Sequence, residues 1–234
     1  MRRADTLTPP LVKGGRRMRM SVYKLFIKRL LDIVLSTAGI VVLAIPMLVV
    51  AVIIKIDSPG PALFKQRRIG LHKKEFTMLK FRSMPVTAPK DVATHQLDVS
   101  SVKMTKFQEA IRKYSIDELP QLYNIWMGSC SIIGPRPALW NQYDLITERD
   151  KHGANDVKPG LTGWAQINGR DELEIPVKAR LDGEYVEKMS FLFDCKCFFG
   201  TIACVLKHDG VVEGGTGEMK KLEEENRKEE LSVK

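Results

Sequence analysis

The chain has 234 residues, of which 44% are hydrophobic and 28% charged, so it can bury a core and is neither disordered nor collagen-like. Its 37 lysines and arginines outnumber its 28 aspartates and glutamates, which gives a net charge of +9. A positive net charge of this size points to an anionic partner. The three candidates are nucleic acid, a membrane surface and a phosphorylated substrate.

The positive charge is concentrated on both sides of one uncharged segment. Residues 1–31 contain nine basic residues and one acidic residue, and residues 55–82 contain eight basic and two acidic residues. From Ser83 onward the chain is slightly acidic, with 20 basic and 24 acidic residues. Because the soluble part is acidic overall and lacks an aromatic and basic platform, a nucleic-acid binder is excluded.

The first 20 residues are rich in arginine, proline and glycine and show no apolar periodicity, which predicts a basic disordered arm. A second interpretation places the start of the native protein at Met18 or Met20. Residues 1–17 would then lie upstream of the true start. Mass mapping of the native N-terminus distinguishes the two interpretations.

The next region is predicted to be a membrane element, residues 21–57. Ser21 to Asp32 has the pattern of an amphipathic helix that approaches an anionic membrane surface. Ile33 to Ile54 contains 22 residues without a charge. As a helix these residues would be about 33 Å long, enough to cross the roughly 30 Å hydrocarbon core of a bilayer. A signal peptide is excluded, because the apolar run is too long and starts too late.

Pro46 lies inside the apolar run, where a proline removes one helix hydrogen bond and clashes with the preceding turn. A spanning helix is expected to have a basic excess on its cytoplasmic side only, whereas both flanks are basic here. These observations favour a re-entrant helix that enters the bilayer, bends at Pro46 and returns to the same face. A single spanning helix is the alternative.

A β-hairpin is predicted directly after the membrane element. Ser58-Pro-Gly-Pro61 ends the helix, and two strands follow at Leu63 to Arg68 and Glu75 to Met84. Since side chains alternate along a strand, Lys80 and Arg82 are expected to project from the same face.

The remainder of the chain is predicted to be mostly helical. Short amphipathic helices are expected at Phe107 to Tyr114 and at Pro120 to Met127, the second ending at Gly128. Phe193 to Lys207 predicts a helix with a wide apolar face, suited to packing or to a membrane interface. The sequence ends in a charged tail at residues 216–234.

Glycine and proline predict two loops, at Gly134 to Pro137 and at Pro159-Gly160. The four cysteines form no C-x-x-C pair and the four histidines are scattered, which argues against a zinc site. This cysteine usage also indicates a reducing, cytosolic compartment for everything outside the membrane.

The segment Ser115 to Pro120 contains two adjacent carboxylates, Asp117 and Glu118. One interpretation is structural, because Ser115 and Glu118 match the S-x-x-E capping box at the start of a helix. A second interpretation starts the helix nearer Pro120, since proline prefers the first helical turn. The two carboxylates would then lie at the mouth of the helix, where backbone N–H groups also attract phosphate.

Two adjacent carboxylates suit phosphoryl transfer, because one can attack phosphorus while the other holds a divalent metal that neutralises the phosphate oxygens. Such a site also needs cations that bind substrate phosphate. The candidates are Lys80, Arg82, Arg112 and Arg136. The alternative for each one singly is a solvated surface charge.

Four collinear segments of the chain resemble the bacterial sugar transferase family, the monotopic phosphoglycosyl transferases that act on polyprenyl phosphate. These segments are KFRSM (Lys80–Met84), SIDELPQLYNIWMGSCSIIGPRP (Ser115–Pro137), KPGLTGWAQINGR (Lys158–Arg170) and LDGEYVEKMSFLFD (Leu181–Asp194). The resemblance covers roughly Ser21 to Gly215. It implies the minimal form of the family, without the multi-span region of larger members.

The resemblance implies an enzyme that transfers a sugar-1-phosphate from a UDP-sugar to undecaprenyl phosphate, releasing UMP and initiating glycan assembly. Asp117 is then the nucleophile that forms a covalent phosphosugar intermediate in a ping-pong mechanism, and Glu118 binds Mg²⁺. Arg112 and Arg136 match positions implicated in binding substrate phosphates. A non-catalytic membrane-anchored scaffold of a glycan assembly complex is the alternative function.

The expected fold class is therefore α/β, mostly α with a small β-hairpin, in a monotopic membrane protein. A re-entrant N-terminal helix would precede a cytosolic catalytic domain, residues 58–215, that has interfacial amphipathic helices. The resemblance places this domain at the cytoplasmic face of the bacterial inner membrane. Many family members have Ser before the helix-breaking proline, whereas this chain has Ile45 before Pro46.

Overall fold

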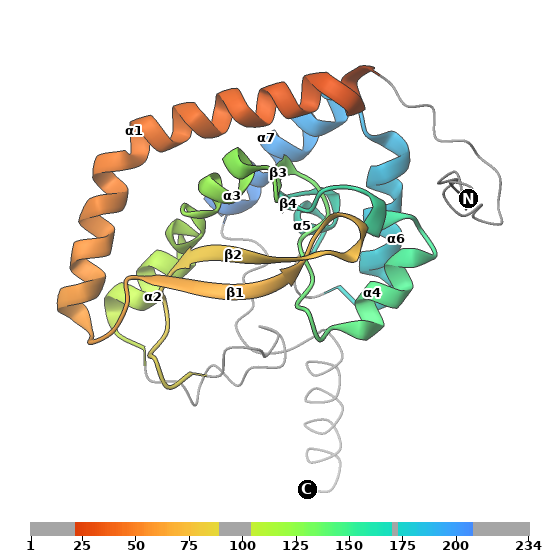
Figure 1. The fold of residues 1–234 in the computed structure, drawn as a ribbon. Helices are drawn as coiled ribbons and strands as arrows, with labels where there is room; N and C mark the ends of the chain where they lie inside the picture. The colour runs from red at the N-terminus through yellow and green to blue at the C-terminus, as the bar shows by residue number, and fades with distance from the viewer. Residues whose placement is uncertain (1–21, 89–103, 170–172, 208–234) are drawn as a thin grey trace, which may run out of the picture.

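The computed structural model describes residues 22–88, 104–169 and 173–207. The predicted N-terminal arm, residues 1–20, and the predicted tail, residues 216–234, lie outside the described residues. Within the described ranges the protein is mostly helical, as predicted, and has two small sheets where one hairpin was expected (Figure 1).

The longest element is α1 (Lys28–Asp57), which follows a π-helical turn at Tyr23–Ile27. Figure 1 shows α1 crossing the top of the domain and then turning sharply downward. Pro46 lies inside this helix, and an internal proline is an ordinary cause of such a bend. By length and composition α1 could cross a membrane, and most of its apolar side chains are exposed. Backbone at Ser58 turns extended, so the helix ends where Ser58-Pro-Gly-Pro61 predicted.

The predicted hairpin is confirmed. Strands β1 (Leu63–Ile69) and β2 (Glu75–Phe81) pair antiparallel, with Leu63 opposite Phe81 and Ile69 opposite Glu75. The second strand ends three residues before the predicted Met84, so Arg82 lies just beyond it.

A second sheet, which the sequence did not reveal, pairs β3 (Ser131–Ile133) in parallel with β4 (Gly160–Thr162). The prediction of a loop at Pro159-Gly160 is therefore wrong for Gly160, which opens β4. A Cβ atom on Gly160 would lie 2.1 Å from the backbone nitrogen of Gly134, so glycine is needed here for close approach of two backbones.

The other helices surround these sheets. They are α2 (Lys106–Lys113), α3 (Gln121–Met127), α4 (Tyr143–Asp150), α5 (Trp164–Ile167), α6 (Ile175–Lys188) and α7 (Phe191–Lys207). The predictions for α2, α3 and α7 are confirmed to within two residues at each end, and α3 ends at Gly128 in the left-handed conformation that favours glycine.

The domain holds the N-terminal end of α1 through polar contacts. Lys28 Nζ lies 2.6 Å from Asp194 Oδ2 on α7, and Tyr23 and Tyr185 also donate to this carboxylate. One turn further along, Asp32 Oδ1 accepts from the backbone nitrogen of Ile132 at 2.9 Å.

The C-terminal end of α1 is held by the same domain. Ile54 is 1% exposed and packs with Phe81 of the hairpin and Ile111 of α2. Asp57 Oδ2 accepts from Thr105 Oγ1 at 2.8 Å. Both ends of this 30-residue helix are therefore fixed to one folded unit.

Candidate active site

The hairpin and α3 are joined by a single buried amide, Asn124. Its Oδ1 accepts from the backbone nitrogen of Leu79 at 2.9 Å, and its Nδ2 donates to the carbonyl of Thr77 at 2.8 Å. Because backbone groups of β2 are satisfied by a side chain of α3, the register between the two elements is fixed. This contact sets the start of α3 beside Lys80 on β2.

The two carboxylates lie in a 3₁₀ turn, Ile116–Glu118, between α2 and α3. The capping-box interpretation is wrong, because Ser115 adopts left-handed backbone with φ 55° and its side chain makes no cap hydrogen bond. The capping box belongs to Thr105 and Gln108 at the start of α2. Pro120 is the N-cap of α3, so Asp117 and Glu118 lie just before this helix, as the second interpretation predicted.

Glu118 is bound by two cations. Its Oε1 accepts from Lys80 Nζ at 2.8 Å and from Arg136 NH2 at 2.9 Å. Burial alone would raise the pKa of Glu118, but the charges and hydrogen bonds of Arg136 and Lys80 outweigh it and hold the pKa well below its usual range. Glu118 is therefore an ionised carboxylate at all physiological pH values.

Asp117 has a different environment although it is the adjacent residue. It is 7% exposed, and its Oδ2 accepts from Ser83 Oγ at 3.3 Å. Burial raises the pKa of Asp117 to about 6, against the lowering effect of Lys80, and the negative charge of Glu118 adds to the increase. The carboxylate is mostly ionised near neutral pH and is poorly stabilised, which suits a nucleophile.

The structure brings four of the six predicted residues into one cluster, namely Asp117, Glu118, Lys80 and Arg136. Arg112 on α2 contributes a positive charge that lowers the pKa of Asp117. The guanidinium of Arg82 instead donates to the carbonyls of Ser58 at 2.7 Å and Ile54 at 3.2 Å, at the end of α1. Arg82, the sixth predicted residue, thus lies where the end of α1 meets the hairpin.

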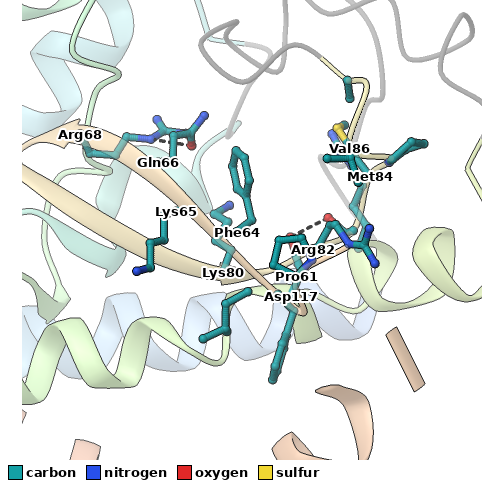
Figure 2. A pocket seen from close by; sticks show the side chains of 16 residues that line it. Pro61, Phe64, Lys65, Gln66, Arg68, Lys80, Arg82, Met84, Val86 and Asp117 are labelled. Carbon is teal, nitrogen blue, oxygen red and sulfur yellow. Dashed lines mark hydrogen bonds between the residues drawn. The ribbon is translucent and has the colours of Figure 1, made fainter. Parts of the chain in front are cut away.

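A cavity of about 360 Å³ opens on the Asp117 side of the cluster, under the hairpin. Figure 2 shows Phe64, Gln66 and Arg68 of β1 on one side of this cavity, and Met84 and Val86 on the other. Basic side chains dominate its charged lining. These are Lys65, Arg68, Lys80, Arg82 and Arg112.

A second cavity, of about 440 Å³, opens on the Glu118 side and lies under α1. Glu118 and Arg136 line it, and most of the other lining side chains are apolar. The two carboxylates of one turn thus face two different cavities.

Reasoning from the sequence missed two residues of the site, Ser83 and Asn124. Ser83 lies next to Arg82 in the KFRSM segment, so the alternation used for Lys80 and Arg82 puts it on the other face of a strand. Because β2 ends at Phe81, that alternation stops before Ser83, and its hydroxyl turns toward Asp117. Asn124 lies inside a helical pattern, although asparagine is a poor helix former. This unfavourable residue choice is the signal in the sequence that its side chain has another role.

No group of three or more His, Cys, Asp or Glu side chains that could hold a metal ion occurs in the ranges 22–88, 104–169 and 173–207. The acidic donors at the site are the two adjacent carboxylates. Mg²⁺ is commonly bound by one or two carboxylates together with substrate phosphates and water, so this donor set fits a metal that arrives with its substrate.

Comparison with known proteins places these residues in a family. The model of the family described as bacterial sugar transferase matches residues 23–208, which include both carboxylates and all four predicted cations. The chain is 40% identical over 187 residues to the "Uncharacterized sugar transferase EpsL" of Bacillus subtilis, covering 80% of this chain and 91% of that protein.

Several relatives have names that state a reaction, and two of these names specify different sugars. The UDP-glucose:undecaprenyl-phosphate glucose-1-phosphate transferase of Escherichia coli is 39% identical over 75% of this chain and 39% of its own length. The UDP-N-acetylgalactosamine-undecaprenyl-phosphate N-acetylgalactosaminephosphotransferase of Aeromonas hydrophila is 35% identical over 77% and 44%. This chain therefore spans less than half of the relatives whose names state a reaction. The match over residues 23–208 and the similarity to the Bacillus subtilis protein show that the chain belongs to the bacterial sugar transferase family.

Proposed function

We propose that this enzyme transfers a sugar-1-phosphate from a UDP-sugar to undecaprenyl phosphate, giving undecaprenyl-diphosphate-sugar and UMP, and so initiates a surface glycan. The observation that carries the proposal is the pair of adjacent carboxylates with opposite pKa shifts, set between a basic cavity and an apolar one. The names of the relatives in Escherichia coli and Aeromonas hydrophila support the substrate classes.

The cavity under the hairpin is the proposed site of the UDP-sugar. The diphosphate of a UDP-sugar is an anion, and the five basic residues that line this cavity match its negative charge. Asp117 lies in the same lining, so its carboxylate has access to the phosphorus that bears the sugar.

The reaction has two steps. In the first, an Asp117 carboxylate oxygen forms a bond to the sugar-bearing phosphorus, and the bond from that phosphorus to the bridging oxygen breaks, which releases UMP. In the second, an oxygen of undecaprenyl phosphate attacks the same phosphorus and the bond to Asp117 breaks. Each step forms one P–O bond and breaks another, and the second regenerates the carboxylate.

The cations around the turn stabilise the charge that develops on the transferring phosphoryl group. Lys80 and Arg136 are held in place by Glu118, and Arg112 adds a third positive charge. We propose that Mg²⁺ also binds here, held by Glu118 and the substrate phosphates. When bound, Mg²⁺ neutralises phosphate oxygens and so favours attack by an anion.

We propose that α1 is re-entrant and that the catalytic domain lies at the cytoplasmic face of the membrane. Both ends of α1 contact the same domain, since Lys28 pairs with Asp194 and Ile54 packs against Phe81. The apolar middle of the helix is exposed. Exposed aromatic side chains on α3 and α7, such as Trp126 and Phe199, suit the interface. Cysteine-labelling probes at Ser21 and Ser58 should both react from the cytoplasm only, whereas one extracytoplasmic site would favour a spanning helix.

The proposed function is tested by UMP release from a panel of UDP-sugars, with and without undecaprenyl phosphate and Mg²⁺. We expect one sugar to support Mg²⁺-dependent turnover, and UDP-sugar alone to leave a sugar-phosphate adduct on the protein. A non-catalytic scaffold would release no UMP with any sugar, and that outcome would overturn the proposal. The panel also identifies the sugar, which differs among the relatives.

A further inference from the structure

Two cations from distant parts of the chain meet at the C-terminal end of α3. A Cβ atom built on Gly128 would lie 3.2 Å from Arg29 NH2 and 3.5 Å from Lys158 Nζ. Arg29 belongs to α1, whereas Lys158 lies two residues before β4. Because glycine has no Cβ, residue 128 leaves the point between these two charged groups unoccupied. The end of α3 is therefore a small cradle with a cation on each side.

Both cations have hydrogen-bond donors left for a ligand. Arg29 NH1 donates to the carbonyl of Ile125 and NH2 donates to that of Trp126, at 2.7 Å each. A guanidinium has more N–H groups than these two, so it can bind a further acceptor. Lys158 Nζ makes no hydrogen bond within the part of the chain that the structure describes. The pair can thus donate to an anion without giving up a contact with the protein.

The local charge favours an anion at this place. Partial burial and the positive charge of Arg29 lower the pKa of Lys158, and the negative charge of Asp32 opposes the decrease. The Oδ1 atom of Asp32 already accepts from Ser131 Oγ at 3.0 Å and from the backbone nitrogen of Ile132 at 2.9 Å. Two positive charges therefore share one carboxylate that is already hydrogen-bonded. An anion between the cations would relieve their repulsion.

The surface next to the cradle is apolar and exposed. Figure 1 shows α3 under the first part of α1, and the exposed side chains of α3 include two aromatic residues of the kinds enriched at membrane interfaces. The exposed residues near the two cations in the sequence are Tyr123, Trp126 and Met127 on α3, and Phe26 and Leu30 at the start of α1. Cations beside an exposed apolar surface match an amphiphile that has an anionic head group and acyl chains.

We propose that Arg29 and Lys158 bind the phosphate of an anionic membrane phospholipid, whose acyl chains lie along the exposed side chains of α3 and α1. The inference rests on the membrane location of α1, which is part of the proposed function, and not on the transfer reaction. Arginine binds a phosphate through paired N–H groups, and lysine binds it as a point charge.

This phospholipid site is separate from the active site. Asp117 and Glu118 lie just before the first residue of α3, whereas Arg29 and Lys158 lie at its last turn. Seven residues of helix separate the two places by about 10 Å. The phospholipid is therefore a structural ligand that holds the N-terminal part of α1 and the end of α3 at one leaflet, and it takes no part in phosphate transfer.

The test measures lipid binding by the full-length protein in detergent micelles. Phosphatidylglycerol and phosphatidylcholine with the same brominated acyl chains are titrated in turn, because bromine quenches the fluorescence of a tryptophan that it contacts. We expect phosphatidylglycerol to reach half of its maximal quenching at a several-fold lower lipid fraction, since it is the anionic lipid. Trp126→Phe should abolish this difference, and a difference that persists in Trp126→Phe would place the lipid elsewhere and overturn the proposal.

Variants of Lys158 test the cradle itself. Lys158→Gln removes one cation without removing a hydrogen bond and should raise the half-quenching fraction of phosphatidylglycerol about fivefold. Lys158→Arg should restore the wild-type value. Lys74→Gln is the matched control, because it makes the same change of charge at an exposed lysine of the hairpin turn. Equal quenching by the two lipids, or equal responses of Lys158→Gln and Lys74→Gln, would overturn the proposal.

Competition distinguishes the sources of the phosphate. Inorganic phosphate should relieve the quenching no more than sodium chloride of the same ionic strength, and undecaprenyl phosphate should not displace an equal amount of phosphatidylglycerol. Relief by inorganic phosphate alone would identify a site for a soluble anion, and displacement by undecaprenyl phosphate would assign the cradle to the acceptor. Either result would overturn the phospholipid site. No UDP-sugar is needed, so a chain that releases no UMP would overturn the proposed function alone.

Discussion

The two cavities beside the active-site turn differ in nearly every physical respect although they share it. The cavity under the hairpin has basic side chains and lies next to Asp117, whose pKa is raised, and the cavity under α1 is apolar and lies next to Glu118, whose pKa is lowered. The difference shows that two neighbouring carboxylates acquire opposite pKa shifts from the elements packed against each of them.

The largest effect is expected on the hairpin side, for Asp117→Asn. An amide cannot attack phosphorus, so we expect transfer to fall by at least about 10³-fold and the sugar-phosphate adduct to disappear. Intact-protein mass spectrometry and UMP release check both results. Retained activity would mean that Asp117 is not the nucleophile.

The same variant should be more stable than the wild type at neutral pH. The folded-state pKa of Asp117 is raised to about 6, so the ionised form destabilises the folded protein above that pH. The pKa shift from 3.8 to about 6 is roughly two units, and each unit corresponds to about 1.4 kcal/mol, which gives an increase of about 3 kcal/mol at pH 7. Thermal unfolding at pH 5 and pH 7 tests the sign, because the gain should shrink at the lower pH.

On the other side of the turn, Glu118→Gln should reduce turnover about 10²-fold. The amide removes the carboxylate charge that both Lys80 and Arg136 contact, and on the proposed role of Glu118 it should also weaken the binding of Mg²⁺. The dependence of the rate on Mg²⁺ concentration tests the proposed role of Glu118 in binding the metal, since it should shift for Glu118→Gln. An unchanged Mg²⁺ dependence would place the metal elsewhere.

The pH dependence gives a smaller effect. Adduct formation should decrease about tenfold for each unit below pH 6, because protonation of Asp117 removes the nucleophile. Glu118 should not titrate in this range, since its pKa is held well below its usual range. Ser83→Ala should move the midpoint to higher pH, because the Ser83 hydroxyl donates to the carboxylate, and Ser83→Thr should restore it.

The smallest expected effect is for Lys65→Ala, which should raise the KM for the UDP-sugar about threefold and leave the KM for undecaprenyl phosphate unchanged. Lys65 is exposed and lines the hairpin cavity only. Lys74→Ala, which removes an exposed lysine outside this lining, is the control. An equal effect on both substrates would mean that Lys65 does not act through the UDP-sugar alone.

The sequence predicted the elements that have strong local signals. The hairpin, α2, α3 and α7 follow from periodicity, and the apolar run predicted α1. The parallel pair β3 and β4 was missed because strands of three residues are too short to show alternation. Helix α6 was missed as well, since Asp182 and Gly183 are polar or small residues that are nevertheless buried in it.

Within the site, the identity of the residues was easier to predict than their partners. Proline at position 120 correctly indicated where α3 starts, and thereby where Asp117 and Glu118 lie. The role of Arg82 depends on carbonyls at the end of α1, which no pattern in the hairpin reveals. Contacts across long sequence separations, such as Ser83 with Asp117, depend on tertiary packing alone.

The contacts of Arg82 also connect the active-site turn to the end of α1, the helix that we propose to be re-entrant. Arg82 follows Lys80 by two positions, so the lysine that contacts Glu118 and the arginine that contacts the end of α1 are linked by about 7 Å of extended chain. A lipid phosphate diffuses within the plane of the bilayer and cannot leave it. With α1 in the membrane as we propose, the enzyme and its lipid acceptor share one plane, and their encounter becomes a search in two dimensions.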